Sequence, residues 1–263
     1  MNLNITPYEL VNIVIAEFSQ GIIDQLKDNV VGIYLFGSLT YGDFNAESCD
    51  IDLMVVVNTP LTKEDILLVK STHQLIEQKY PMWNHRIEAS YTPLYMLNNI
   101  LPPKEPRPYY GEGIMHEASE YGNEWIINLY LLYGYGKTVT GTDIRDLINK
   151  IDIVEVQKAC IRDLFKEWEP KLNTPEWLEN SHYQSYLVLN LCRILNTVIN
   201  AEAWSKKASA SWVKIKYPEW SELISSAENW KYGDNLYKQT ETLKFLTFVI
   251  DKVKGTVLFR LGD

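Results

Sequence analysis

Cysteine is scarce in this chain, which has three among its 263 residues. Cys49, Cys160 and Cys192 are odd in number and far apart, so the sequence indicates neither a disulfide framework nor the close spacing of a metal site. A chain without structural disulfides suits a reducing compartment. The N-terminus also lacks a basic segment followed by an apolar one, which is how a secretory signal begins. We therefore expect a cytoplasmic protein.

The chain also lacks long apolar runs, and it has fewer basic than acidic residues. No uninterrupted apolar stretch reaches the roughly 18 residues that a membrane-spanning helix needs. Lys and Arg number 25 against 34 Asp and Glu, which gives a formal net charge of -9. Because nucleic-acid-binding domains normally present a basic face, we expect neither a nucleic-acid nor a membrane partner. An acidic chain suits a cationic small molecule, although acidic proteins are common, and we expect a monomer or a weak homodimer.

The most informative segment is a glycine-serine turn after an apolar stretch. Residues 30–36 are apolar and β-prone, which predicts a strand, and Gly37 and Ser38 follow at once. Glycine lets a backbone approach a phosphate closely, and a serine hydroxyl can donate a hydrogen bond to it. The pattern therefore predicts a phosphate-binding turn, with Gly37 and Ser38 as nucleotide ligands.

A second apolar stretch, residues 51–57, begins beside two carboxylates. Asp50 and Asp52 are two positions apart, and on a strand such residues point to the same face while Ile51 turns to the other. Two close carboxylates repel each other unless a cation lies between them, and Mg²⁺ takes oxygen ligands that it shares with substrate phosphates. The pattern predicts a magnesium-dependent site for nucleotidyl transfer. The alternative is a solvated turn or a helix cap at a strand end.

This arrangement resembles the nucleotidyltransferase signature of the DNA polymerase β superfamily. In that signature a hydrophobic run, Gly-Ser and a spacer precede an Asp-hydrophobic-Asp pair, and a third carboxylate is expected on a later strand. Glu88, within the alternating segment 86–91, supplies the third carboxylate. The resemblance implies that Asp50, Asp52 and Glu88 bind Mg²⁺.

A narrower resemblance covers most of the chain. It is to the aminoglycoside nucleotidyltransferases of the streptomycin/spectinomycin adenylyltransferase type, and it implies an α+β fold. A polymerase β-like nucleotidyltransferase domain with a mixed sheet is expected to precede an α-helical bundle domain, with the active cleft between them. The segments that carry the resemblance are residues 110–113, 124–129, 187–193 and 205–212.

The resemblance implies transfer of AMP from ATP to a hydroxyl of an aminoglycoside or aminocyclitol antibiotic, with release of pyrophosphate. In that family Glu88's counterpart binds metal, lies at the substrate and accepts the hydroxyl proton as general base. Residues of the second domain are implied to bind the nucleotide. They are Arg193, Lys206 and Tyr232. Alternatives are a solvated helix face or a helix-capping role for the two cations, Lys207 in place of Lys206, and a core position for the tyrosine.

Departures from the family pattern leave the acceptor open. Cys49 stands where the family commonly has serine, Gly113 where its members carry Trp, and Tyr183 and Gln184 in the region where they place an acidic substrate contact. Glu112, beside the missing Trp, is the candidate substrate carboxylate, and the alternative is a solvated loop residue. Two other functions stay open. One is a nucleotidyltransferase of this fold acting on another small molecule or a protein hydroxyl, and the other is a non-catalytic nucleotide-binding toxin–antitoxin module.

Hydrophobic periodicity predicts the elements around these motifs. Segment 102–108 is proline-rich and is expected to be a loop that cannot form an inner strand. Segment 137–141 is expected to be a turn. Strand patterns end near residue 151, so we place the nucleotidyltransferase domain at 1–153 and the helical domain at 154–263. Helices are expected over 8–26, 62–79, 124–133, 154–168, 182–200, 205–216 and 236–253, and strands over 30–36, 51–57 and 86–91.

Overall fold

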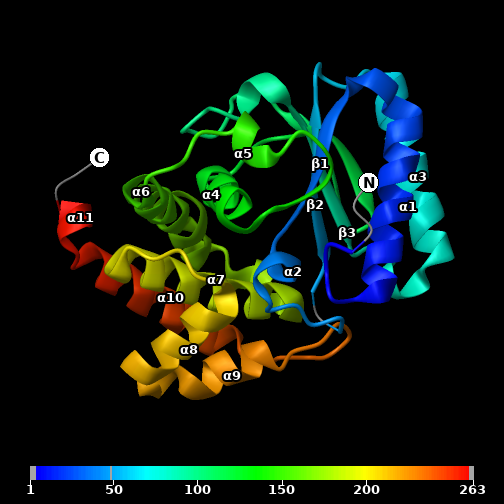
Figure 1. Cartoon of the computed structure of the whole chain (residues 1–263). Coiled ribbons are helices and arrows are strands. Elements are labelled where there is room, and N and C mark those ends of the chain that lie inside the picture. Colours follow the sequence, from blue (N-terminus) through cyan, green and yellow to red (C-terminus); the bar gives the residue numbers. More distant parts are fainter. Residues whose placement is uncertain (1–3, 48, 261–263) are drawn as a thin grey trace. The chain divides into compact units, whose positions relative to one another are not determined.

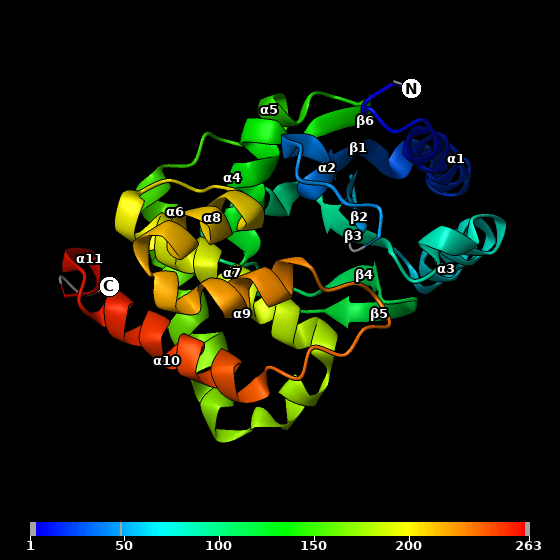
Figure 2. The same cartoon turned by 90° about the horizontal axis from the view of Figure 1, so that it is seen from below.

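The computed structural model describes residues 4–47 and 49–260 of the chain. The chain divides into two compact units, Met1–Lys150 and Ile151–Asp263, which run from blue to green and from green to red in Figure 1. Figure 2 shows the same elements after a quarter turn. The predicted domain boundary after residue 153 stays a prediction.

The first unit contains a six-stranded mixed sheet. Its strands lie in the order β5-β4-β3-β2-β1-β6. Strands β2 and β3 run parallel, and every other neighbouring pair runs antiparallel. The predicted α+β class, a mixed sheet followed by helices, is confirmed. The strands are β1 Val30–Phe36, β2 Ile51–Val57, β3 Ile87–Pro93, β4 Arg107–Gly111, β5 Ile114–Ser119 and β6 Lys137–Gly141.

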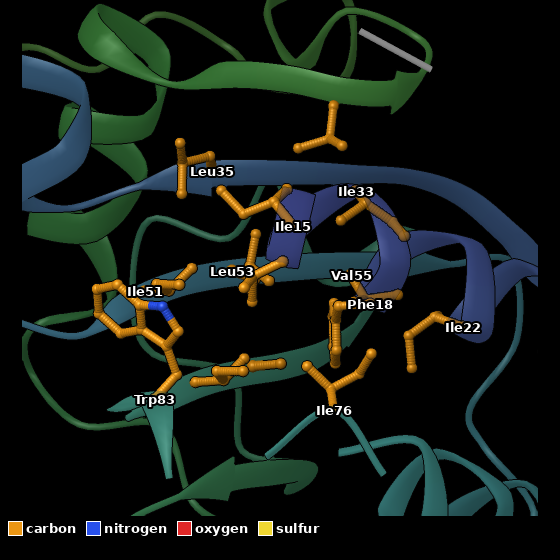
Figure 3. Close-up of a cluster of buried hydrophobic side chains, with 14 of the residues drawn as sticks. Ile15, Phe18, Ile22, Ile33, Leu35, Ile51, Leu53, Val55, Ile76 and Trp83 are labelled. Atoms are coloured by element: carbon orange, nitrogen blue, oxygen red, sulfur yellow. The ribbon is translucent and has the colours of Figure 1, made fainter. Parts of the chain in front are cut away.

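Two long helices cover one face of this sheet, α1 (Glu9–Leu26) and α3 (Lys63–Lys79). Apolar residues at helical spacing, such as Phe18 and Ile22 of α1, meet Leu53 of β2 in a common core (Figure 3). Burying one such side chain contributes about 1.5–3 kcal/mol. This core fixes which face of the central strands is turned away from the two helices.

The start of α3 is set by Thr62, as predicted. Its hydroxyl accepts a hydrogen bond from the Asp65 N–H over 3.1 Å, and the Asp65 carboxylate accepts one from the Thr62 N–H over 2.9 Å. This reciprocal pair satisfies two backbone donors that a helix start leaves without partners, and such a cap stabilises a helix by about 1 kcal/mol.

The prediction that segment 102–108 cannot enter an inner strand is wrong at its C-terminal end. Strand β4 begins at Arg107 and lies between β3 and β5, so Pro108 is part of an inner strand. Proline has no N–H to donate, and the register of β4 against β5 shifts between Arg107 and Tyr109. The irregularity takes Pro108 out of the regular ladder, which is how an inner strand accommodates a proline.

Segment 137–141 is a strand and not the predicted turn. It forms β6, which pairs antiparallel with β1, with Gly32 opposite Gly141. Val139, at the centre of the strand, is buried whereas Lys137 and Gly141, at its two ends, are exposed. A strand this short owes its conformation to its neighbour more than to its own sequence.

The second unit contains helices and no strand within residues 151–260. Helix α7 lies at its centre and packs against α6, α8, α9 and α10. The four helices predicted for this region are confirmed, and the short α9 and α11 were not predicted. The helices are α6 Ile153–Asp163, continued by a π-helical turn at Leu164–Trp168, α7 Ser181–Asn200, α8 Lys206–Lys216, α9 Ser221–Glu228, α10 Gln239–Lys254 and α11 Val257–Arg260.

Three further helices belong to the first unit. Helix α4 contacts β1 and lies on the opposite side of the strands from α1 and α3 (Figure 1). Across residues 4–47 and 49–260, none of the helices is long and apolar enough to cross a bilayer. The three helices are α2 Ser38–Tyr41, α4 Trp125–Tyr135 and α5 Ile144–Leu147.

Candidate functional site

Two carboxylates lie directly opposite each other on neighbouring parallel strands, Asp52 on β2 and Glu88 on β3. The next residues, Leu53 and Ala89, belong to the core beneath α1 and α3, so both carboxylates project from the other face. Neighbouring strands are roughly 4.8 Å apart, and neither side chain is fully buried. The structure thus brings two of the three predicted carboxylates together.

Gly37 lies against Asp52. Its φ is +69°, a conformation that residues with a side chain rarely adopt, and a Cβ at this position would overlap the Asp52 carboxylate. Ser38 follows as the first residue of α2, a single helical turn. The predicted phosphate-binding turn therefore lies beside the carboxylates, in a place that only glycine can occupy.

A phenol from β4 joins this group of side chains. The Tyr109 hydroxyl donates a hydrogen bond to Glu88 Oε2 over 2.7 Å. Burial, together with the charges of Glu88 and Asp52, raises the pKa of Tyr109 far above its ordinary value. The phenol therefore stays protonated and acts as a donor to the carboxylate.

The remaining predicted carboxylate, that of Asp50, contacts an arginine. Arg86 Nε lies 3.4 Å from Asp50 Oδ1. The remaining guanidinium nitrogens donate to the carbonyl oxygens of Ala46, over 2.9 Å, and of Cys49. The guanidinium also lies 5.0 Å from the centre of the Trp83 ring. Arg86 therefore connects the start of β3 to the segment before β2 through hydrogen bonds, and its ion pair with Asp50 is one of these connections.

The carboxylates suit a hard divalent cation, although the structure does not gather all three. Within residues 4–47 and 49–260, no three His, Cys, Asp or Glu side chains lie close enough to hold a metal ion together. Asp52 and Glu88 offer the oxygen donors that Mg²⁺ takes. The 3.4 Å contact between Asp50 and Arg86 is longer than a good hydrogen bond, so a side-chain rotation could exchange it for a cation. The donor chemistry fits the predicted magnesium site, whose occupation stays a prediction.

Arg193, a predicted nucleotide ligand of the second unit, is buried on α7. Only 9% of the residue is exposed, and Nη2 donates to Asn190 Oδ1 over 2.8 Å. Nε has no acceptor in the part of the chain that the structure describes. Burying a charged donor without an acceptor is costly. The alternative of a solvated helix face is therefore wrong for Arg193, whose contact with a nucleotide stays a prediction.

Lys206 is the first residue of α8, and its side chain reaches α7. Its Nζ lies 4.0 Å from the centre of the Tyr186 ring. Tyr186 and Arg193 are seven positions apart, which places them on the same face of α7. A cation in the first turn of a helix is opposed by the helix dipole, so helix stability gives no reason for a lysine here. The two predicted phosphate ligands thus lie along one face of α7.

Tyr232 belongs to an aromatic group near the start of α7. Its ring centroid lies 5.1 Å from that of Trp230 and 5.4 Å from that of His182. Trp230 and His182 stack on each other at 5.4 Å, with 19° between their planes. Because Tyr232 is 42% exposed, the alternative of a core aromatic is wrong, and its contact with a nucleotide stays a prediction.

Comparison with known proteins shows to which family the chain belongs. Residues 17–87 match the model of the nucleotidyltransferase domain, and residues 148–254 match that of the aminoglycoside adenylyltransferase C-terminal domain. The chain belongs to the nucleotidyltransferases of the aminoglycoside adenylyltransferase type. The predicted family and enzyme class are confirmed.

Relatives and a solved structure resemble this nucleotidyltransferase along most of its length. A spectinomycin 9-adenylyltransferase of Campylobacter jejuni is 26% identical over 257 residues, covering 93% of this chain and 92% of that protein. Another, of Enterococcus faecalis, is 25% identical over 240 residues, covering 80% and 83%. A crystal structure of an Enterococcus faecalis spectinomycin adenyltransferase with ATP and spectinomycin matches with a TM-score of 0.70 over 92% of this chain and 98% of that one. At 21% identity, this last likeness establishes the fold.

Glu112, the predicted substrate carboxylate of this nucleotidyltransferase, lies at the tip of the β4–β5 hairpin. Gly111 pairs with Ile114, which leaves Glu112 and Gly113 as a two-residue turn. Both turn residues have positive φ, +52° and +76°, a pattern typical of a type I′ turn. The Glu112 side chain is exposed, and its contact with a substrate stays a prediction.

Two residues of the nucleotidyltransferase site escape sequence-based prediction, Tyr109 and Arg86. The signal for Tyr109 is its alternation with the buried Tyr110, which has meaning only once β4 is recognised as a strand. The signal for Arg86 is the parallel pairing of β2 with β3, which sets Arg86 beside Asp50. Both signals depend on how the strands pair, which cannot be deduced from residue spacing within one segment.

Proposed function

We propose that this nucleotidyltransferase transfers AMP from ATP to a hydroxyl of an aminocyclitol antibiotic, releases pyrophosphate and so confers resistance. The observation that carries the proposal is the group formed by Gly37, Asp52 and Glu88, because nucleotidyl transfer requires phosphates held beside paired carboxylates. Two relatives named spectinomycin 9-adenylyltransferase support the acceptor class. A similar structure with ATP and spectinomycin supports the nucleotide.

Glu88 is the proposed general base. It accepts the proton of the acceptor hydroxyl while that oxygen attacks the α-phosphorus of ATP, and the new O–P bond forms as the bond to pyrophosphate breaks. Gly37 and Ser38 bind phosphate oxygens through a close backbone approach and a hydroxyl. Asp50, Asp52 and Glu88 would hold Mg²⁺, which when bound neutralises triphosphate charge and aligns the attacking oxygen.

The proposal extends to the second unit, where Arg193 and Lys206 would bind phosphate oxygens and Tyr232 would contact the nucleotide. The buried Arg193 Nε without an acceptor supports this role, as does the position of Lys206 at a helix start. Arginine offers a two-pronged donor and lysine a point charge, and both suit phosphate. We further propose a cytoplasmic monomer or weak homodimer with a cationic small-molecule partner and no nucleic-acid partner.

Arg193→Ala and Lys206→Ala are expected to weaken the stabilisation of the protein by MgATP. A ligand at 100 times its Kd stabilises the folded state by about 2.7 kcal/mol, and a tenfold loss of affinity removes about 1.4 kcal/mol of that. Thermal unfolding with and without MgATP measures the difference for each variant. The control is Lys207→Ala, since Lys207 is the exposed neighbour of Lys206. Equal MgATP shifts in the parent and in both test variants would contradict the phosphate-binding role.

Spectinomycin is expected to be a better acceptor than streptomycin. Gly113 stands where the resembling members carry Trp, and no larger residue fits, because φ is +76° and a Cβ would overlap the His85 ring. The aromatic wall that Trp would supply is therefore missing. Pyrophosphate release with each antibiotic at equal concentration measures the preference, and efficient use of streptomycin would contradict it.

Glu112→Gln is expected to lower kcat/KM for the cationic acceptor about two- to fivefold, as for the loss of one exposed ion pair of about 0.5–1 kcal/mol. Its effect on ATP binding should be small. Glu117→Gln is the matched control, because Glu117 is an exposed carboxylate on β5 of the same hairpin. An unchanged kcat/KM in Glu112→Gln would show a solvated turn residue.

A second candidate function is adenylyl transfer to a different hydroxyl, of another small molecule or of a protein. Two features favour it. One is the absence of an aromatic side chain at Gly113, and the other is the presence of Tyr183 and Gln184 in the region where the family places an acid. A pyrophosphate-release screen over aminocyclitols, other antibiotics and protein acceptors separates the two functions.

A further inference from the structure

We propose that Tyr109 is a positioning residue that holds the general base Glu88 in its reactive orientation. The inference rests on the proposed function, because that function makes Glu88 the proton acceptor. It adds a residue of β4 that lies outside both segments matched by the domain models. The central observation is the 2.7 Å hydrogen bond from the Tyr109 hydroxyl to Glu88 Oε2.

The direction of the Tyr109 side chain follows from strand geometry. The next residue, Tyr110, points into the core, where its ring stacks on His73 at 3.8 Å. The Tyr110 hydroxyl donates to the buried Glu77 Oε2 over 2.9 Å. Because side chains alternate along a strand, Tyr109 is turned to the opposite face, which carries the two carboxylates. Strand β4 is thus anchored on one face and presents its phenol on the other.

The Tyr109 ring is itself held by neighbouring side chains. The Arg107 guanidinium lies 5.4 Å from the centre of the Tyr109 ring and 4.0 Å from that of Tyr121. Arg107 also donates to the Ser119 carbonyl oxygen over 3.1 Å, and the His116 ring of β5 stacks near Tyr109 at 6.2 Å. A ring fixed in this way loses little further freedom when its hydroxyl binds a carboxylate.

A fixed donor has a direct consequence for Glu88. The terminal torsion of a glutamate side chain is broad, so an unrestrained carboxylate samples many orientations. A hydroxyl 2.7 Å from one carboxylate oxygen restricts that rotation and so fixes the direction of the second oxygen. A general base works only within hydrogen-bond reach of the proton that it takes. Tyr109 therefore contributes chiefly to the chemical step, because Glu88 keeps its charge for Mg²⁺ when the hydrogen bond is lost.

Tyr109→Phe tests the inference, because it removes one oxygen and keeps the ring. We expect kcat for AMP transfer to spectinomycin to fall about 10- to 100-fold, the range for a misplaced reacting group. KM for ATP and for spectinomycin should stay within about twofold of the parent, since the lost contact is to the base alone. An unchanged kcat, or a loss that appears wholly in KM, overturns the inference.

Two other phenol–carboxylate pairs of the same unit serve as matched controls. Tyr110→Phe removes the bond to buried Glu77, so it should lower the melting temperature and leave kcat near that of the parent. Tyr95→Phe removes an exposed bond to Glu105 of 2.5 Å, so it should change neither quantity. If Tyr110→Phe lowers kcat as much as Tyr109→Phe does, the effect is a general loosening of β4 and the inference is wrong.

A double variant adds a second readout. Residues that act as one unit have non-additive effects on rate, so Tyr109→Phe should lower kcat little further when Glu88→Gln is already present. Multiplied losses in the double variant would contradict the inference. An AMP adduct on Tyr109 after incubation with MgATP alone, seen by mass spectrometry, would make the phenol an acceptor and would also overturn it.

Failure of the inference is distinguishable from failure of the proposed function. A parent protein that releases no pyrophosphate with any acceptor overturns the function. The orientation of Glu88 is then compared in crystal structures of the parent and of Tyr109→Phe. A Glu88 rotamer that differs between the two supports the positioning role, and an identical rotamer overturns it.

Discussion

Asp52→Asn is expected to lower kcat for AMP transfer about 10³-fold and to leave the fold intact. Asp52 lies opposite Glu88 and against Gly37, so the substitution removes a charge from the centre of the proposed site. Metal-assisted charge stabilisation is worth several kcal/mol, and a loss of about 4 kcal/mol lowers kcat about 10³-fold. Single-turnover kinetics at saturating MgATP measures the loss, and circular dichroism checks the fold.

Asp50→Asn serves as the comparison for Asp52→Asn. It should lower AMP transfer as well, but it also takes the carboxylate away from Arg86, whose side chain is only 12% exposed. The free energy of unfolding should therefore fall on the order of 1 kcal/mol. Turnover near that of the parent in both variants would contradict the metal-binding role of the pair.

Glu88→Gln is expected to lower kcat by about 10²–10⁴-fold, the usual range for a lost general base. Glutamine keeps the size of the side chain, and its carbonyl oxygen can still accept the Tyr109 hydrogen bond, but it cannot take up a proton. ATP binding, followed by calorimetry with Mg²⁺, should weaken far less than turnover. The two measurements separate the role of base from that of ligand.

The opposite result for Glu88→Gln has a clear meaning. If ATP binding is lost while single-turnover chemistry persists at saturating ATP, Glu88 is a metal ligand only. The Tyr109 hydrogen bond would then position a ligand. Glu117→Gln, an exposed carboxylate replaced in the same unit, controls for the change in net charge.

Local signals are enough to predict the strands that carry the first motif. Residues 30–36 and 51–57 are mostly apolar, with Asp52 as the one charged residue, and their bounds agree with β1 and β2. The helix cap at Thr62 is also local, since its partner Asp65 is three residues away. The residues within each of these elements are enough to predict it, so no knowledge of the fold is needed.

Strands β4 and β6 cannot be predicted from their own residues in this way. Pro108 argues against an inner strand until the bulge that accommodates it is known, and segment 137–141 is too short to stand out beside its flanking glycines. Each is a strand because of the neighbour that it pairs with. Sequence reasoning that considers one segment at a time therefore misses both.

The candidate carboxylates of the site can be predicted from the sequence. The side chains that form hydrogen bonds or ion pairs with them cannot. Spacing identifies Asp50 and Asp52, since a two-residue period has meaning within a single strand, and the resemblance to the polymerase β superfamily adds Glu88. The hydroxyl that binds Glu88 and the guanidinium that binds Asp50 come from other segments. They become visible only when the order and register of the strands are known.

Strand β6 also bears on how the protein is made. β1 lies between β2 and β6, and β6 is the last of the described strands to be synthesised. Until Lys137–Gly141 leaves the ribosome, the outer edge of β1 keeps unpaired N–H and C=O groups, which are the groups by which strands of different chains join. Translation at roughly 5–20 residues per second leaves this edge open for several seconds. During that interval the edge of β1 is available for pairing with a strand of another molecule.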